Sequence, residues 1–148
     1  MSENPTINED LLVRTYLPRD LVDVGRIFSS LGRESKFLSY AGSYVCCFMG
    51  LPVGIIVPRI AGRYLHIREL CTLKRFQRQG VATALIAFIE KRSIELSQVK
   101  SIVVKVPLDT SHSDAMAYFN KRYEFVQSVN DNLVFLDRLS KEKEVSTW

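Results

Sequence analysis

Two hydrophobic periods run along the chain, and each predicts one kind of element. Where apolar and polar residues alternate, or where a short apolar run is rich in β-branched residues, the pattern predicts a strand. The strands predicted in this way are residues 7–16, 43–49, 53–57, 64–73, 101–106, 124–129 and 133–136. Where apolar residues return every three or four positions, the pattern predicts an amphipathic helix. The helices predicted in this way are residues 18–31, 34–40, 81–96 and 111–119.

Turn and cap residues mark where these segments end. Pro18 suits the first turn of a helix because its missing N–H needs no partner there, and Asp20 places a carboxylate at the positive end of the helix. Gly32 ends that helix. Gly50-Leu51-Pro52 predicts the turn of a hairpin, and Ala61-Gly62-Arg63 predicts the next turn.

The order of the predicted elements is that of a mixed α/β fold, with α+β character. Helices alternate with strands, but hairpins are present too. We therefore expect a central mixed sheet with helices on both faces. We expect a single domain over residues 1–139, which is long enough to bury a full core, and a charged tail over residues 140–148.

Composition narrows the class of protein. The chain has 148 residues, of which 47% are hydrophobic and 24% charged, as in a folded globular protein rather than a disordered one. No apolar run is long enough to span a bilayer, and residues 1–10 are too polar for a secretory signal. The cysteines Cys46, Cys47 and Cys71 show no metal-ligand or disulfide spacing. We therefore expect free thiols and a reducing compartment, the cytoplasm.

The segment that carries candidate chemistry joins the strand at 64–73 to the helix that begins near Gly80. The first amides of a helix have no partners inside the helix and point along its axis, so they can bind a phosphate or pyrophosphate. Small residues, here Gly80 and Ala82, let the backbone approach such a ligand closely. Three cations of the connection add positive charge: Lys74, Arg75 and Arg78.

Two other interpretations of this basic connection stay open. It can be a solvated loop before an amphipathic helix, or a nucleic-acid patch in which Phe76 stacks on a base. One short patch in a chain of net charge +4 is little for nucleic acid, because phosphate binding depends on many cations. The pattern therefore favours an anion site built from backbone amides.

The hexapeptide Gln77-Arg78-Gln79-Gly80-Val81-Ala82 resembles the Gln/Arg-x-x-Gly-x-Gly/Ala signature of the GNAT superfamily of acyl-CoA N-acyltransferases. The element order is similar to that of the family over residues 7–137. The resemblance implies a GNAT-type mixed sheet of six or seven strands, mostly antiparallel, whose two central strands splay to admit pantetheine. It also implies that acetyl-CoA is the co-substrate.

The resemblance also implies binding roles. The signature loop and the first helical turn would hold the CoA pyrophosphate, and the end of the preceding strand would line the thioester. The expected pyrophosphate-binding residues are Arg78, Gln79, Gly80, Val81, Ala82 and Thr83, and Gln77 is expected among the other cofactor-binding residues. The expected thioester-lining residues are Leu70, Cys71 and Thr72.

Glu69 is the candidate general base. It stands on an apolar strand face with Ile67 and Cys71, where a carboxylate is costly unless it is solvated or paired, and partial burial would raise its pKa. Such a carboxylate could take a proton from an incoming ammonium near neutral pH. The alternative is an ion pair with Arg68, Arg63 or another neighbour.

Tyr118 is the candidate general acid. The resembled family often has a tyrosine on the helix after the splayed strand, and its phenol can protonate the leaving thiolate. This chain departs from that pattern, because His112 or Ser113 stands near the usual asparagine position and Glu124 replaces a glycine. The tyrosine position therefore falls on one of three neighbours: Tyr118, Phe119 or Asn120. If it falls elsewhere than on Tyr118, solvent must protonate the thiolate, and Tyr118 then only packs the helix on the sheet.

Nothing in the sequence suggests a metal or a covalent intermediate. The two histidines, His66 and His112, lack the accompanying ligands of a metal site. We therefore expect an N-acetyltransferase that moves acetyl from acetyl-CoA directly to a primary amine in a ternary complex. The alternative is an acyl-CoA-binding sensor or regulatory subunit with weak or no activity.

The expected partners follow from this interpretation. They are acetyl-CoA and an amine substrate, with no membrane partner, no favoured role for nucleic acid, and a homodimer as an open option. The amine could be a small molecule, a protein lysine or a protein N-terminus. Acceptor contacts are expected from residues 28–44 and 126–135.

Overall fold

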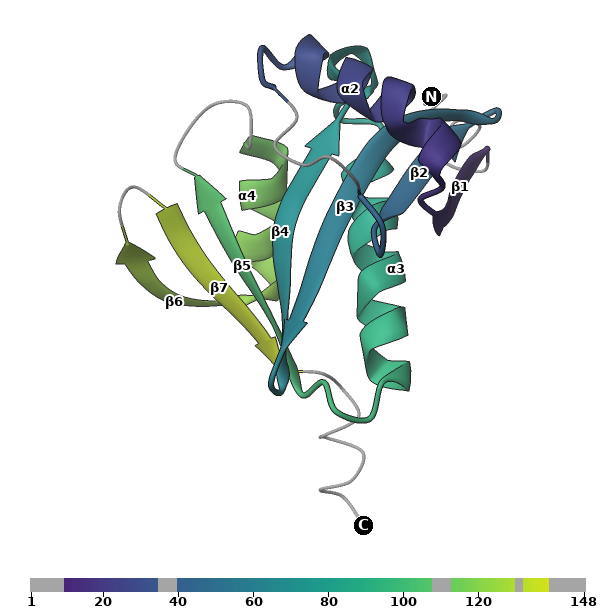
Figure 1. Cartoon of the computed structure of the whole chain (residues 1–148). Coiled ribbons are helices and arrows are strands. Elements are labelled where there is room, and N and C mark those ends of the chain that lie inside the picture. Colours follow the sequence, from purple (N-terminus) through teal and green to yellow (C-terminus); the bar gives the residue numbers. More distant parts are fainter. Residues whose placement is uncertain (1–9, 35–39, 108–112, 130–131, 139–148) are drawn as a thin grey trace. The chain divides into compact units, whose positions relative to one another are not determined.

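The computed structural model describes residues 10–34, 40–107, 113–129 and 132–138. Within these residues seven strands form one sheet in the order β1-β2-β3-β4-β5-β7-β6 (Figure 1). The strands are β1 (Leu11–Thr15), β2 (Tyr44–Phe48), β3 (Leu51–Ala61), β4 (Tyr64–Thr72), β5 (Ser101–Pro107), β6 (Glu124–Val129) and β7 (Asn132–Arg138). β4 and β5 pair in parallel, whereas β1–β2, β2–β3, β5–β7 and β6–β7 pair antiparallel. The predicted mixed, mostly antiparallel sheet is therefore confirmed.

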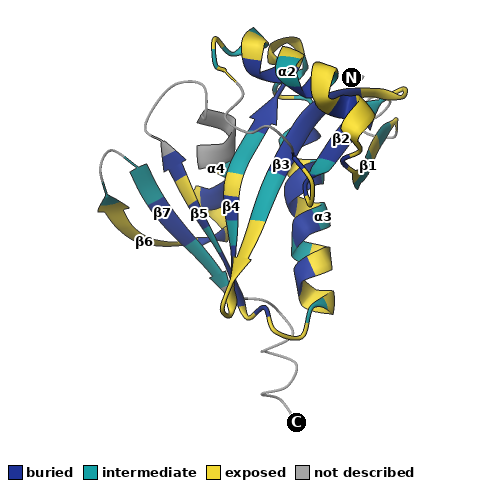
Figure 2. Cartoon of the chain, viewed as in Figure 1, coloured by how far each residue is buried: buried dark blue, intermediate teal, exposed yellow. Residues whose placement is uncertain are grey.

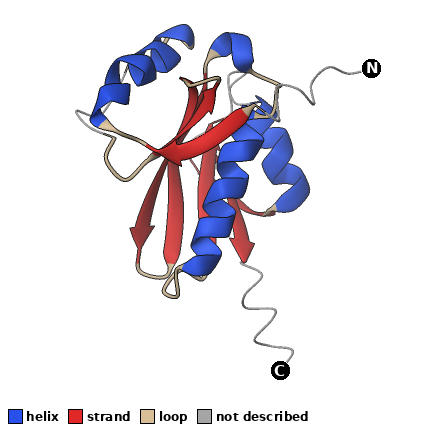
Figure 3. Ribbon diagram, turned by 90° about the vertical axis from the view of Figure 1, so that its right-hand side faces the viewer, coloured by secondary structure: helices blue, strands red, loops and turns tan. Residues whose placement is uncertain are grey.

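The helical elements fall between the strands. They are the 3-10 turn η1 (Pro18–Asp20), α2 (Leu21–Ser30), the 3-10 turn η2 (Lys74–Phe76), α3 (Val81–Glu95) and α4 (Ser113–Arg122). α3 is the longest of the described helices and runs without interruption (Figure 3). None of the helices among the described residues is both long and apolar enough to cross a membrane.

The chain divides into two compact units. The first contains residues 1–57 and 69–87, and the second contains residues 58–68 and 88–148. Three elements, β3, β4 and α3, begin in one unit and end in the other. The expected splay of the two central strands concerns both units and stays a prediction, as does the single domain over residues 1–139.

In the first unit, helices cover both faces of the sheet. Ile55 of β3 belongs to a buried cluster with Val24, Ile27 and Phe28 of α2. Gly54 is the neighbour of Ile55 and faces the opposite side of the strand. A Cβ placed at Gly54 would meet side chains of α3, and these lie at its first two turns. The buried, dark blue positions of β2 and β3 in Figure 2 form this core.

In the second unit, apolar side chains of one sheet face pack against α4. Ile102 and Val104 of β5 are buried, and their partner strand β7 places the ring of Phe135 on the same face. Phe119 of α4 is fully buried and stacks on Phe135 with ring centroids 6.0 Å apart. The other face of β5 is less covered, because Lys105 is exposed. β5 is therefore buried on one face and partly exposed on the other.

The first hairpin differs from its prediction. Its turn is made by Met49 and Gly50, which have φ values of 51° and 87°, rather than by Gly50-Leu51-Pro52. The following strand starts at Leu51 and continues to Ala61, beyond the predicted end at Val57. Parts of two predicted elements stay predictions, because residues 7–9 of the first strand and residues 35–39 of the short second helix lie outside the described part of the chain.

Candidate active site

Two residues near the end of the connection from β4 to α3 have a backbone in the left-handed region. Arg78 has a φ of 66° and Gly80 a φ of 91°. The Gly80 carbonyl accepts a hydrogen bond from the Ala84 N–H at 2.9 Å, so Gly80 is the N-cap of α3. The amides of Val81, Ala82 and Thr83 are therefore the first of the helix, and such amides have no acceptor within the helix itself.

Local hydrogen bonds stabilise the connection before Gly80. The Phe76 N–H donates to the Leu73 carbonyl at 2.8 Å, and the side-chain amide of Gln79 donates to the Arg75 carbonyl at 3.2 Å. The Phe76 ring packs on Phe48 of β2, with centroids 5.4 Å apart. The ring therefore has an apolar partner within the fold, which supports a packing role rather than base stacking.

The start of α3 sits directly on β3. A Cβ at Gly54 would lie 2.5 Å from Cγ1 of Val81, 3.1 Å from Cδ1 of Leu85 and 3.3 Å from the Cys71 carbonyl. Only glycine leaves room for the helix at this distance. Gly54 therefore sets how closely the start of α3 approaches the sheet, and the sequence does not predict this because a glycine inside a strand gives no sign of which segment approaches it.

The end of β4 places its expected thioester-lining residues in a mostly buried setting. Cys71 and Thr72 are buried and Leu70 is half-buried. Just after them, the Leu73 N–H donates to the Val53 carbonyl at 2.7 Å, which ties this end of β4 to β3.

The Cys46 thiol of β2 is a poor candidate for chemistry. Burial is the main reason that the pKa of Cys46 rises to about 12, with the neighbouring Cys47 as a smaller cause. The Cys46 thiol therefore stays protonated at neutral pH and is a poor nucleophile.

Glu69 forms an ion pair, and its partner is Arg33. Nη2 of Arg33 lies 2.9 Å from Oε1 of Glu69, and Nη1 of Arg33 donates to Sγ of Cys71 at 3.1 Å. The Glu69 side chain is 11% exposed and that of Arg33 is 24% exposed. The guanidinium also lies over the Phe28 ring, 5.4 Å from its centroid. Burial lowers the pKa of Arg33, but Cys71 and Glu69 outweigh it and the pKa is raised.

The sequence left open whether Glu69 forms an ion pair with Arg68, Arg63 or another neighbour. The structure shows an ion pair with Arg33. Arg33 follows the helix-ending Gly32 and is thirty-six positions away from Glu69 in sequence. No local pattern indicates a pair at this distance. The role of Glu69 as a general base stays a prediction, and this geometry adds a specific structural role to be tested against it.

Tyr118 lies beside a carboxylate of α3. Its hydroxyl is 3.5 Å from Oε1 of Glu90, a long hydrogen bond, while the hydroxyl of Tyr123 donates to Oε2 of Glu90 at 2.9 Å. Burial and then Glu90 raise the pKa of Tyr118 above its ordinary value. The guanidinium of Arg122 lies 4.9 Å from the centre of the Tyr118 ring. Its role as a general acid stays a prediction.

The other two candidates for the tyrosine position occupy different environments. Phe119 is fully buried between Phe135 and Tyr123 and has a packing role. Asn120 is exposed. Tyr118 is half-buried, and of the three candidates it alone carries a phenol that could donate a proton. Because Glu69 and Tyr118 belong to different units, their expected cooperation in one site also stays a prediction.

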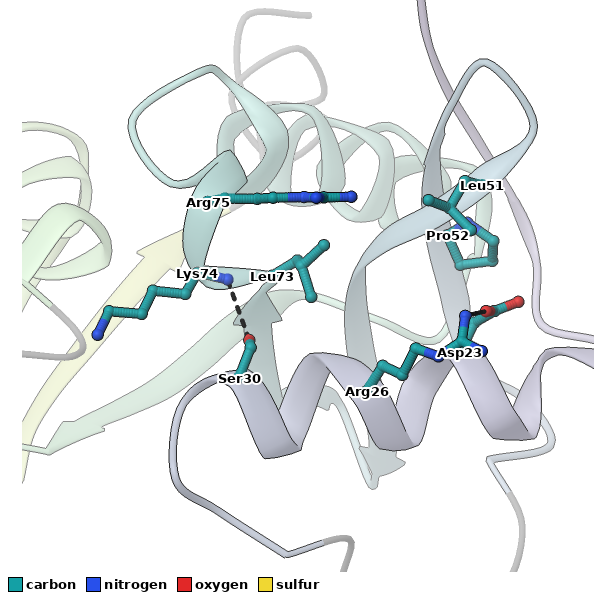
Figure 4. A pocket seen from close by; sticks show the side chains of 8 residues that line it. All are labelled: Asp23, Arg26, Ser30, Leu51, Pro52, Leu73, Lys74 and Arg75. Atoms are coloured by element: carbon teal, nitrogen blue, oxygen red, sulfur yellow. Dashed lines mark hydrogen bonds and ion pairs between the residues drawn. The ribbon is translucent and has the colours of Figure 1, made fainter.

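A pocket of about 380 Å³ lies in the first unit beside η2 (Figure 4). Apolar side chains form part of its wall, and three cations and one acid stand around it. Its lining residues are Asp23, Arg26, Ser30, Leu51, Pro52, Leu73, Lys74 and Arg75. The Lys74 N–H donates to the Ser30 hydroxyl at 3.0 Å and closes one side (Figure 4). No local sequence pattern predicts this pocket, because α2, the start of β3 and η2 are distant in sequence.

Some predicted contacts cannot be placed. His112 and residues 130–131 of the expected acceptor segment 126–135 lie outside the described part of the chain, as do residues 140–148. Among the residues that the structure describes, no three histidine, cysteine, aspartate or glutamate side chains gather as a metal site would require.

Comparison with known proteins identifies the fold. Residues 35–133, well over half of the chain, match the family described as acetyltransferase (GNAT) domain. No curated protein sequence matches the chain. Ard1 from Thermoplasma volcanium has a similar structure, with a TM-score of 0.75 and 20% identity over 88% of this chain and 98% of that one.

Two further structures are similar at lower identity. The ribosomal-protein-S18-alanine N-acetyltransferase from Escherichia coli has a TM-score of 0.72 and 12% identity over 87% of this chain and 94% of that one. Arabidopsis thaliana Naa50, in complex with the bisubstrate analogue CoA-Ac-MVNAL, has a TM-score of 0.71 and 12% identity over 86% of this chain and 98% of that one. These similarities show a shared fold. With the family match, they establish that the chain belongs to the GNAT acetyltransferase family.

Proposed function

We propose that this chain is an acetyl-CoA-dependent N-acetyltransferase that acts on a primary amine. The observation that carries the proposal is the start of α3. There Gly80 caps the helix in a left-handed conformation and leaves the first helical amides available to an anion. Family membership supplies the reaction class, and the geometry supplies a place for the pyrophosphate.

The proposed co-substrate contacts are those of the signature loop. The amides of Val81, Ala82 and Thr83 would bind pyrophosphate oxygens at the positive end of the helix dipole. The Arg78 side chain would add positive charge, and Gln77 and Gln79 would flank the phosphates. A similar fold holds a CoA derivative in Naa50, which supports this assignment.

The proposed thioester end of the site is the last part of β4. Leu70, Cys71 and Thr72 would line the acyl group, and main-chain amides of this strand would polarise the thioester carbonyl and stabilise the oxyanion. The half-buried to buried setting of these residues excludes part of the water that would otherwise weaken such bonds.

The proposed reaction is direct attack of the amine on the thioester. Glu69 takes a proton from the ammonium, so that the nitrogen lone pair can form the new C–N bond. The tetrahedral intermediate then breaks its C–S bond, and the CoA thiolate takes a proton from Tyr118 or from solvent. No protein nucleophile is needed. Holding two substrates side by side supplies much of the acceleration.

The proposal leaves the acceptor as an amine of a small molecule or of a protein. A thiol-release assay with acetyl-CoA and a panel of small amines and peptides tests the reaction. A thermal shift with acetyl-CoA tests binding, since a ligand that binds the folded state raises stability by RT ln(1 + [L]/Kd). We expect both a shift and turnover. A shift with no turnover on any amine would favour an acyl-CoA sensor, and no shift would remove the proposal.

A charge placed at the helix start tests the site itself. Gly80→Glu puts a carboxylate where the pyrophosphate would lie, and we expect the acetyl-CoA-induced shift to disappear. Gly25→Glu makes the same chemical change on α2, where a Cβ meets nothing within 4 Å, and should keep the shift. Equal binding by both variants would contradict the assignment of the loop.

A further inference from the structure

In the second unit, the strand register gathers cations on one face of the sheet. β4 and β5 pair in parallel with His66 opposite Val103, so these two side chains point to the same face. Arg68 and Lys105 each lie two residues further along and therefore share that face. Both are exposed.

The opposite face of the same strands is the core of the unit. Leu65 and Ile67 of β4 and Ile102 and Val104 of β5 are all buried. The exposed cations Arg68 and Lys105 therefore lie on the face opposite this core. The alternation separates a buried apolar face from a basic one.

Arg59 of β3 lies beside this cluster, because Arg59 is three residues before and His66 three residues after the two-residue turn Gly62-Arg63 that joins the neighbouring strands β3 and β4. His66 is half-buried, and its pKa is lowered first by burial and then by the positive charges of Arg59, Lys105 and Arg68. Arg59 is exposed, as Figure 2 shows for the end of β3 that belongs to this unit. The arrangement therefore holds three permanent cations within electrostatic reach of one imidazole.

Acidic side chains are sparse on this face. Among the described strand residues of the unit, Glu124 shares the face, because it pairs with Leu136, which pairs with Val103. It lies on β6, two strands away from β5. An anion bound on this face would lie close to several positive charges at once.

We propose that this basic face, formed by Arg59, His66, Arg68 and Lys105, binds an acidic polypeptide segment. Charge complementarity selects the acidic partner. The neighbouring side chains select a polypeptide rather than a nucleic acid. Tyr64 is exposed and Val103 and Leu136 are half-buried on the same face, so apolar contact is available beside the cations. Four basic side chains are also few for nucleic acid, whose binding typically neutralises about six to ten phosphates.

This inference does not depend on acetyl transfer, so it can be tested by binding alone. The probe is a fluorescein-labelled peptide in which glutamate alternates with leucine, and fluorescence anisotropy with the full chain measures its affinity. A matched peptide with glutamine in place of glutamate and a labelled polythymidine strand are the comparisons. We expect the acidic peptide to bind best, with affinity that falls between about 50 and about 300 mM sodium chloride.

Charge reversal assigns the binding to the face. Lys105→Glu and Arg59→Glu should each weaken binding of the acidic peptide by at least about fivefold. Lys91→Glu makes the same change on the exposed side of α3 and should change it less than about twofold. Far-UV circular dichroism checks that all variants fold.

Three results would overturn the proposal. They are equal binding of the glutamate and glutamine peptides, tighter binding of the polythymidine strand, and an equal loss of binding in Lys91→Glu and Lys105→Glu. Each of these leaves the proposed acetyltransferase activity unaffected, and loss of that activity would leave this binding result standing.

Discussion

Asp20 lies almost fully buried at the start of α2, with 2% of its surface exposed, and two groups hold its carboxylate. Arg14 of β1 donates from both terminal nitrogens, at 2.8 and 2.9 Å, and the Leu17 N–H donates at 2.8 Å. These bonds fasten the first strand to the first helix. The hydrogen bonds from Arg14 are the main reason that the pKa of Asp20 is lowered, and burial acts in the opposite direction.

This pair predicts a dependence of stability on pH. A carboxyl whose pKa is lowered by folding stabilises the folded state above its unfolded pKa of about 4, and the contribution is lost as the pH falls through the folded pKa. We expect Asp20→Asn to lower the free energy of unfolding by roughly 2 kcal/mol at neutral pH. The difference from wild type should shrink below about pH 4, as urea unfolding at several pH values would show.

Asp23→Asn is the matched control for that prediction. Asp23 pairs with Arg26 at 3.1 Å, but the Arg26 side chain is 68% exposed. Such a pair contributes less than about 0.5 kcal/mol, so the control should behave like wild type. A loss in Asp20→Asn that stays constant in acid would contradict the role given to the ionised carboxylate.

Glu69 carries the second prediction at this scale. If it is the general base, Glu69→Gln should lower kcat by about a hundredfold or more while the acetyl-CoA-induced thermal shift stays unchanged. The amide keeps the size of the side chain but cannot accept the proton. Steady-state kinetics on the best amine found in the panel and the thermal shift measure the two quantities.

The pair with Arg33 gives the competing outcome for Glu69. Arg33→Gln removes the partner of Glu69 and leaves a carboxylate that is mostly buried, so it should lower stability. If Glu69 serves only this ion pair, Glu69→Gln and Arg33→Gln should both lower the melting temperature, and kcat should stay at the wild-type value in Glu69→Gln. That pattern would remove Glu69 as the base.

At the scale of elements, Gly54 decides how closely α3 approaches β3. We expect Gly54→Val to lower stability by about 1 to 3 kcal/mol, because the new side chain overlaps Val81 and Leu85. It should also raise the KM for acetyl-CoA, because displacing the start of α3 moves the amides that follow Gly80. Urea unfolding and initial rates measure the two effects.

A second glycine provides the control for this prediction. Gly25 lies inside α2, and a Cβ there meets nothing within 4 Å. Gly25→Ala should therefore stabilise the protein by up to about 1 kcal/mol through helix propensity, with no change in KM. A Gly54→Val variant with the wild-type KM would show that the seat of α3 on β3 does not position the loop.

The tyrosines of α4 and its end give the next prediction. Tyr123 is buried with its hydroxyl on Glu90, so Tyr123→Phe should cost about 1 kcal/mol of stability and leave kcat near wild type. The hydroxyl of Tyr118 makes the longer contact to Glu90, at 3.5 Å, so Tyr118→Phe should cost less stability. If Tyr118 is the general acid, its variant lowers kcat. An unchanged kcat would assign the protonation to solvent.

Element type was predictable where one period dominates. The stripe of apolar residues in α3 and the β-rich runs of β2, β5, β6 and β7 were found from sequence because burial repeats with the geometry of the element. The end of β3 was not. The strand was predicted to end at Val57, whereas β3 continues through Pro58; its pairing with β2 ends at Ile56, so no β2 carbonyl requires the amide that Pro58 lacks.

The first hairpin was misplaced for a related reason. Met49 adopts a positive φ, which is uncommon for a residue with a side chain, and Gly50 and Pro52 are the usual turn signals. Pro52 instead pairs with Cys47 next to a register irregularity, where proline is tolerated. Turn signals therefore located the hairpin to within two residues and could not identify the turn itself.

The whole molecule shows what kind of site a sequence can predict. The proposed anion site of the signature loop is contiguous in sequence, so a sequence motif could predict it. Arg33 with Glu69, Gly54 with Val81, and the pocket beside η2 each join distant segments. Such contacts depend on the fold and have no local pattern. The basic face is an intermediate case, because alternation predicts which residues of one strand share a face but not which strands are neighbours.

The two compact units share β3, β4 and α3, and this predicts how the molecule unfolds. A strand or helix that continues from one unit into the other cannot lose its hydrogen bonds in one half without weakening the other, so we expect a single cooperative transition. Gly54→Val, although it lies in the first unit, should then lower hydrogen-exchange protection by a similar factor in β5 and β7 of the second unit as in β2 of the first. Mass spectrometry of peptides from these strands measures this. Loss of protection confined to the first unit would show that the shared elements do not couple the two units and that each unfolds separately.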